Sequence, residues 1–135
     1  MRDKALAPHT AVVEKLILCS MSGDLEGAKA CIHATNIFHE AANLPYPGEF
    51  VGHAGFIRLL TTMNSVFEAA IEDYELIDDG TRVVARMQLA LKSRISGRSL
   101  RTPVVELYSF TEGQISSVDI FYKDGQAVSD LAAGR

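Results

Sequence analysis

The chain has 135 residues, a formal net charge of −4 and a pI near 5.5. That length is enough for one domain with its own hydrophobic core, and the 47% hydrophobic fraction is that of an ordinary globular protein. The acidic balance argues against a nucleic-acid partner, which would require a basic surface. We therefore expect a single domain over residues 1–135, with its core at about 8–124 and a C-terminal tail at 125–135.

The two cysteines, Cys19 and Cys31, lie among apolar residues and lack metal-ligand spacing. They predict buried, reduced thiols and no metal site. No apolar run follows Met1-Arg2-Asp3-Lys4, so we expect no secretory signal. No apolar stretch reaches the roughly 18 residues that a membrane span needs. Together these observations favour a cytoplasmic protein without a membrane partner.

The first half of the chain has mainly helical periodicity. Apolar residues spaced by three and four predict a helix over about 8–21, and Asp24 is a good N-cap for a second helix through about residue 34. A third helix is expected over about 53–67. Between them, residues 37–40 are a short strand candidate, and the prolines within 43–48 exclude regular structure there.

The second half of the chain is expected to form strands. In 82–92 the odd positions are apolar and the even positions include Arg86 and Gln88, which is the alternation of a half-buried strand. Further strands are predicted over 74–77, 102–110 and 114–123. Helices followed by hairpins indicate an α+β fold. We expect three N-terminal helices on a strongly curved antiparallel or mixed sheet, forming a cone with a small, largely apolar pocket inside.

Glu106 is the most informative candidate for a functional residue. It shares a strand face with Val104, Tyr108 and Phe110. If that face is covered, desolvation raises the pKa of the Glu106 carboxyl and leaves it able to donate a hydrogen bond. If the face is exposed, or if Glu106 pairs with Arg86, the residue is structural. The sequence leaves both interpretations open.

Glu40 and His39 end the predicted strand before the proline-rich loop, where side chains often lie at a pocket mouth. Glu40 is a candidate general base, or a solvated loop acid. A regular strand points His39 to the opposite face, where it is either a second acid–base candidate or a hydrogen-bonded structural residue.

Asp119 is a fourth candidate, because it lies mid-strand on the same face as Phe121. It either joins Glu106 in the pocket or forms a salt bridge with a surface lysine. The expected pocket lining is mainly apolar or aromatic and consists of Leu16, Tyr46, Phe50, Phe56, Met63, Phe67, Met87, Tyr108 and Phe121.

The residues resemble the nuclear-transport-factor-two-like, or cystatin-like, superfamily, which includes ketosteroid isomerase and the SnoaL-like polyketide cyclases. The resemblance covers about 12–124. It rests on Ser22-Gly23-Asp24-Leu25-Glu26, on Phe38-His39-Glu40 followed by Pro45-Tyr46-Pro47-Gly48-Glu49-Phe50-Val51-Gly52, and on 106–110 with Gly113-Gln114-Ile115, Tyr122 and Asp124. Their order and spacing are similar to the helix–turn–helix step, first strand and final hairpin of the family.

The resemblance implies a SnoaL-like protein that binds a small apolar metabolite and transfers protons next to a carbonyl, as an isomerase or cyclase without cofactor. It places Glu40 at the position of the aspartate base and Glu106 at that of the protonated aspartate of the oxyanion hole. Leu16 takes the place of the first-helix tyrosine. The alternative is a non-catalytic ligand-binding or dimerisation module. A homodimer through the outer sheet face is also implied.

Overall fold

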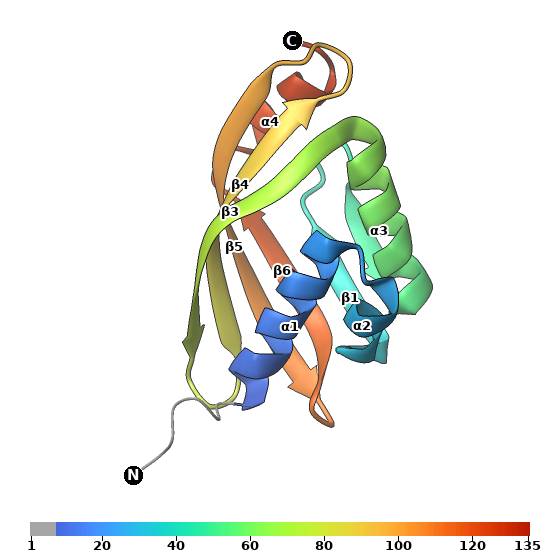
Figure 1. Cartoon of the computed structure of the whole chain (residues 1–135), viewed down its shortest axis with the longest axis vertical. Coiled ribbons are helices and arrows are strands. Elements are labelled where there is room, and N and C mark those ends of the chain that lie inside the picture. The colour runs from blue at the N-terminus through green and yellow to red at the C-terminus, as the bar shows by residue number, and fades with distance from the viewer. Residues whose placement is uncertain (1–7) are drawn as a thin grey trace.

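The computed structural model describes residues 8–135, so the expectation about Met1–Lys4 lies outside the described part. Within it, the chain forms an α+β fold in which helices pack on one curved, mixed sheet (Figure 1). The helices are α1 (Pro8–Ser22), α2 (Leu25–Ala30), α3 (Gly52–Val66) and α4 (Gly125–Ala132). The strands are β1 (Ile32–Glu40), β2 (Gly48–Val51), β3 (Phe67–Asp78), β4 (Val83–Ser93), β5 (Ser99–Thr111) and β6 (Gln114–Tyr122). The predicted fold class is confirmed, and the sheet is strongly curved without closing into a barrel.

The sheet has the strand order β2-β1-β6-β5-β4-β3. All neighbours are antiparallel except β1 and β6, which are parallel. Helices α1, α2 and α3 gather on the concave side, whereas α4 packs near the end of β4 and β5 (Figure 1). In β4 the odd positions are buried and the even ones are half-buried or exposed, as the alternation predicted. The covered face of the sheet therefore contains Val83, Ala85 and Met87.

The second helix is shorter than predicted, and the first strand is longer. Asp24 does cap α2, because its carboxylate accepts a hydrogen bond from the Gly27 N–H at 2.9 Å. The helix ends at Ala30, since the next residues pair with β6: the Ile115 N–H donates to the Cys31 carbonyl at 2.9 Å. A helix through residue 34 was therefore wrong. This long-range pairing gives β1 nine residues.

The sequence patterns also missed two elements and part of a third. Strand β2 follows the proline-rich loop and pairs with β1, from Ile37 opposite Val51 to Glu40 opposite Gly48. Strand β3 begins at Phe67, directly after α3, and is longer than the predicted 74–77. Residues 125–132 form α4 in place of a tail. This helix is amphipathic, with Val128 and Leu131 buried and with Asp124 as its N-cap.

None of the helices within residues 8–135 is long and apolar enough to cross a membrane.

Candidate functional site

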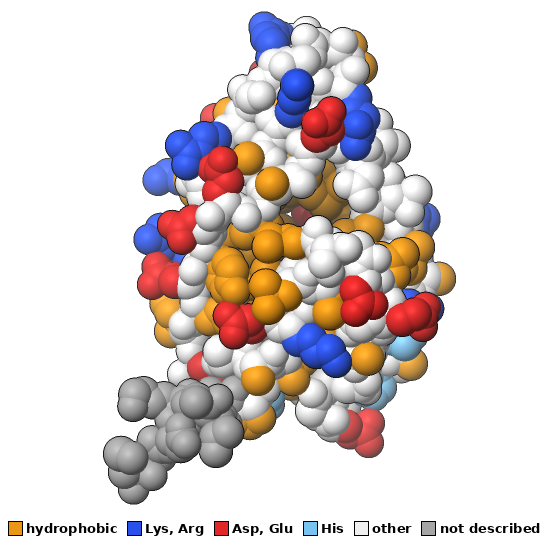
Figure 2. Space-filling model, in the orientation of Figure 1, with side chains coloured by type: hydrophobic (Ala, Val, Ile, Leu, Met, Phe, Trp, Pro, Cys, Tyr) orange, Lys and Arg blue, Asp and Glu red, His pale blue; other side chains and the backbone are white. Residues whose placement is uncertain are grey.

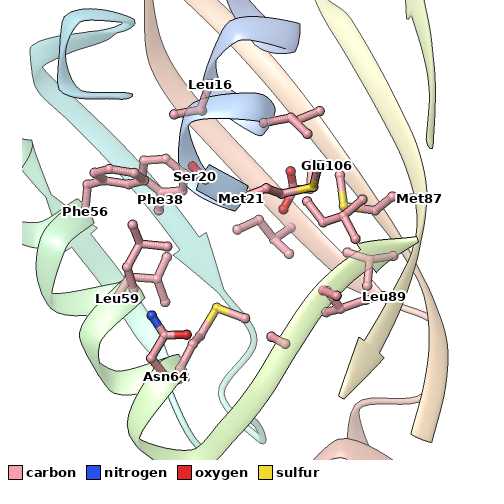
Figure 3. Close-up of a pocket in the computed structure, with 18 of the residues that line it drawn as sticks. Leu16, Ser20, Met21, Phe38, Phe56, Leu59, Asn64, Met87, Leu89 and Glu106 are labelled. Carbon is pink, nitrogen blue, oxygen red and sulfur yellow. The ribbon is translucent and has the colours of Figure 1, made fainter. Parts of the chain in front are cut away.

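A pocket of about 570 Å³ lies between the helices and the concave face of the sheet. Its walls come from α1, the turn after it and the first residue of α2, from α3, and from the strands β1 and β3 to β6. Figure 2 shows the surface hollowed where hydrophobic side chains gather, and Figure 3 shows the interior. The lining consists of Leu16, Ile17, Ser20, Met21, Ser22, Gly23, Leu25, Phe38, Glu40, Phe56, Ile57, Leu59, Leu60, Thr61, Met63, Asn64, Ala69, Ala70, Ile71, Met87, Leu89, Val104, Glu106, Tyr108, Ile120 and Tyr122. Most of these side chains are apolar, so the few polar ones determine the chemistry.

Glu40, the last residue of β1, lies in this lining and is only 9% exposed. Its Oε1 atom is buried and has no hydrogen-bond partner. Burial raises the pKa of the Glu40 carboxyl to about 9, and the nearby charge of Glu106 contributes to the rise. The interpretation of Glu40 as a solvated loop acid is therefore wrong.

Glu106 comes from the middle of β5, and its side chain lines the same pocket (Figure 3). The Tyr108 hydroxyl, two residues along the strand, donates a hydrogen bond of 2.5 Å to Glu106 Oε1. Burial raises the pKa of Glu106, while this hydrogen bond opposes the rise because it favours the ionised carboxylate. Arg86 points to the opposite face and pairs with Glu75 at 2.9 Å, so a Glu106–Arg86 pair is excluded.

Tyr122 adds a third polar group that the sequence analysis did not select. Its hydroxyl lies 2.8 Å from that of Tyr46, and Tyr122 lines the pocket while Tyr46 is buried behind it. Burial, the adjacent Tyr46 and the neighbouring acids keep the pKa of Tyr122 well above its usual value, so the hydroxyl remains protonated. The sequence offered only the alternation that places Tyr122 on the same strand face as Ile120. The register, with Ile120 opposite Glu106, brings that face to the pocket.

Asp119 and Phe121 do not lie in the pocket. Because Glu106 is opposite Ile120, the residues on either side of Ile120 point to the outer face of the sheet. Phe121 is 54% exposed there. Both expectations for Asp119 are therefore wrong. Its side chain does not lie beside Glu106 in the pocket, and it forms no salt bridge within the described residues.

His39 lies opposite Asp119 in the β1–β6 register, also outside the pocket. Its Nδ1 atom is 3.3 Å from Glu49 Oε2 on β2. His39 and Glu40 therefore point to opposite faces of β1, as predicted for a regular strand. The contact with Glu49 favours a structural role for His39.

The remaining predicted lining residues divide into two groups. Leu16, Phe56, Met63, Met87 and Tyr108 line the pocket. Tyr46, Phe50 and Phe67 are instead buried in the core behind it, where the rings of Tyr46 and Phe67 meet edge to face at 6.5 Å. Residue type alone did not distinguish core from lining, because both are apolar.

Within residues 8–135, no three histidine, cysteine or acidic side chains are grouped as metal ligands would be.

Comparison with known proteins gives the family. The family model of the SnoaL-like domain matches residues 13–118, which is most of the chain. The chain belongs to the SnoaL-like family. None of the curated proteins matches this SnoaL-like domain significantly.

Solved structures share the fold of this SnoaL-like domain at low sequence identity. An NTF2-like protein from Burkholderia xenovorans LB400 has a TM-score of 0.85 at 17% identity, covering 93% of this chain and 95% of its own. TerC, co-crystallised with polyporic acid, has a TM-score of 0.83 at 18% identity, covering 93% and 98%. A putative polyketide cyclase from Xanthomonas campestris pv. campestris has a TM-score of 0.78 at 19% identity, covering 92% of this chain and 96% of its own. These likenesses confirm the NTF2-like, cystatin-like architecture.

Proposed function

We propose that this SnoaL-like domain is a cytoplasmic protein that binds a small, largely apolar metabolite and catalyses proton transfer next to a carbonyl, without a cofactor. The observation that carries the proposal is the convergence of Glu40 and Glu106, from distant strands, in one desolvated pocket. Buried acids with perturbed pKa values are characteristic of acid–base sites. The likeness to a putative polyketide cyclase and to TerC with polyporic acid is consistent with it.

We assign the base to Glu106 and the acid to Glu40, the reverse of the roles that the resemblance implied. The hydrogen bond from Tyr108 supports an ionised Glu106, because a hydroxyl stabilises a carboxylate by donating to it. Glu40 has an unpartnered oxygen and a pKa raised to about 9, so it retains its proton at neutral pH. Burial raises the pKa of both acids, but only at Glu106 does a hydrogen bond oppose the rise, so the pair divides into a base and an acid.

In the proposed step, the Glu106 carboxylate takes a proton from the carbon beside the substrate carbonyl. The electron pair moves onto the carbonyl oxygen, which is stabilised by the O–H of Glu40. The Tyr122 hydroxyl, supported by Tyr46, is a second donor available to that oxygen, and Leu16 supplies none. Glu106 then returns the proton to a different carbon, so isomerisation needs no oxidant or reductant.

With Glu106 as the base and Glu40 as the acid, the rate of catalysed proton transfer should depend on pH in a bell-shaped curve. The rate rises with pH as Glu106 loses its proton, and it falls near pH 9 as Glu40 loses its own proton.

The test is exchange of hydrogen for deuterium on the α-carbons of 2-tetralone, an uncharged two-ring ketone, followed by NMR in D₂O. The wild type should accelerate exchange over buffer. Glu106→Gln and Glu40→Gln should each slow the catalysed rate by roughly 100-fold or more, as expected for loss of a general acid or base. Asp119→Asn is the matched control, because it removes a carboxylate on the outer face of β6 and should leave the rate unchanged.

If both glutamine variants exchange as fast as the wild type, the proposed mechanism is wrong. If the wild type adds nothing to the buffer rate, the alternative of a non-catalytic binding module is favoured.

A homodimer through the outer sheet face is part of the proposal. That face has exposed apolar residues at Ile77 and Phe121, at 56% and 54% exposure. It also has the ion pair between Arg86 and Glu75. Interfaces between proteins combine an apolar centre, often with aromatic residues, and a polar rim.

A further inference from the structure

Three of the four methionines of the chain line the pocket. They are Met21, from the last turn of α1, Met63, from the last turn of α3, and Met87, from the middle of β4. The fourth, Met1, lies outside the described residues. The labelled side chains of Met21 and Met87 both point into the cavity (Figure 3). The pocket therefore concentrates a chemical group, the thioether, that is open to oxidation.

The methionines in the lining differ in their access to solvent. Met21 is 50% exposed, whereas Met87 is 6% exposed and Met63 is half-buried. A dissolved oxidant reaches an exposed side chain directly, but it reaches a buried one only when the fold opens locally. Met21 should therefore react first.

Met21 also lies where a ligand enters the pocket. The turn after α1 contributes Gly23 to the lining and α2 contributes Leu25, and both residues are exposed. Exposed lining residues also come from the end of α3, at Asn64, and from the start of β3, at Ala69. The mouth of the pocket is formed by these segments, and Met21 supplies a thioether to it.

Oxidation of Met21 changes the polarity of this mouth. The O–O bond of a peroxide breaks, one oxygen bonds to the thioether sulfur, which supplies two electrons, and the other oxygen leaves as water. The product, methionine sulfoxide, is a polar side chain, and methionine sulfoxide reductases restore the thioether. An apolar ligand that covers the sulfoxide removes water from its oxygen without donating a hydrogen bond, which costs free energy. The affinity for such a ligand should therefore fall.

The two cysteines do not provide the same control. Cys31 is 4% exposed, and burial raises the pKa of its thiol, so it remains protonated and unreactive. Cys19 is partly exposed, but it is not among the residues that line the pocket. A thiol reductant reverses the oxidation of a cysteine to a sulfenic acid or a disulfide, whereas a sulfoxide requires its own reductase. The two kinds of oxidation can therefore be separated by experiment.

We propose that Met21 is a reversible oxidation site at the mouth of the pocket, and that its conversion to the sulfoxide by a peroxide lowers the affinity of the pocket for apolar ligands. Met63 and Met87 react more slowly, because they are less exposed. The proposal rests on the ligand binding of the proposed function, but not on its catalysis.

The test is the binding of Nile red, an uncharged dye whose fluorescence increases in apolar surroundings, before and after treatment with hydrogen peroxide. Mass spectrometry of peptides records which methionines have gained an oxygen atom. Oxidation of Met21 should weaken binding by about tenfold or more, as expected when a polar group is covered without a partner. Dithiothreitol should not restore the affinity, whereas methionine sulfoxide reductases A and B together should restore it.

Met21→Leu removes the thioether with little change in side-chain volume. This variant should bind the dye as the wild type does and should keep its affinity after peroxide treatment. Met87→Leu is the matched control, because Met87 is a buried methionine of the same lining. It retains Met21, so its affinity should fall after treatment as that of the wild type does.

Four results would each overturn the proposal. Met21→Leu could lose affinity after peroxide treatment as the wild type does, the wild type could keep its affinity with Met21 oxidised, Met87 could be oxidised before Met21, or the dye could fail to bind. Deuterium exchange is measured on the reduced protein without the dye. A failure of the proposed catalysis therefore leaves this result intact, and oxidation can fail to affect binding while exchange succeeds.

Discussion

Replacing Glu40 with glutamine is expected to stabilise the protein at neutral pH, and the gain should grow as the pH rises. Glutamine has nearly the shape of the glutamic acid, but it has no proton to lose. In the wild type, the folded state holds the Glu40 proton up to about pH 9, whereas a glutamate exposed to water has a pKa of 4.5. The contribution of the Glu40 carboxyl to the free energy of unfolding is therefore fully present below pH 4.5, and it is lost as the pH rises toward 9.

The magnitude follows from the raised pKa. Each pH unit between the two pKa values costs about 1.4 kcal/mol, so the free energy of unfolding should fall by about 3 kcal/mol between pH 5 and pH 7 through Glu40. That is a large part of the 5–15 kcal/mol typical of a folded domain. Glu40→Gln should match the wild type near pH 5 and exceed it by about 3 kcal/mol at pH 7. Glu106, whose pKa is also raised, retains a slope of the same sign in the variant.

The assay is urea unfolding of wild type, Glu40→Gln and Glu26→Gln at pH 5, 6, 7 and 8, followed by circular dichroism. Glu26→Gln controls for loss of an exposed acid, where the effect on stability should be small. If wild type and Glu40→Gln lose stability in parallel from pH 5 to 8, the Glu40 carboxyl is not desolvated, and the acid role assigned to it fails as well.

Two further predictions concern the base and the outer face. Tyr108→Phe removes the hydroxyl that donates to Glu106, so the pKa of Glu106 should rise further and the acidic limb of the exchange-rate profile should move to higher pH; an unmoved limb would count against Glu106 as the base. In sedimentation velocity at micromolar concentration, the wild type should be a dimer and Phe121→Asp a monomer, while Ile95→Asp, at an exposed apolar residue of the β4–β5 turn, remains a dimer. A monomeric wild type would remove the dimer proposal.

The failures of the sequence-based predictions share a cause, which β1 illustrates. Residues 32–36 were assigned to a helix or left unassigned because local spacing carries no information about the distant β6. Their extended form depends on that pairing, in which Ile32 lies opposite Ile115. Strand β2 likewise exists because Phe50 and its neighbours pair with β1. Local patterns sufficed where one strand alternates by itself, as in β4.

Periodicity and residue type are local properties of the chain, so they were enough to predict the α+β order, the family, and two acids within apolar strands. Which face of each strand is covered depends on how distant segments pack together, and local patterns do not contain that information. In the β5–β6 register Glu106 lies opposite Ile120, so Tyr122 points into the pocket, whereas Asp119 and Phe121 point to the outer face of the sheet. Alternation fixes which residues share a face, but the helices that pack against the sheet decide which face becomes the pocket.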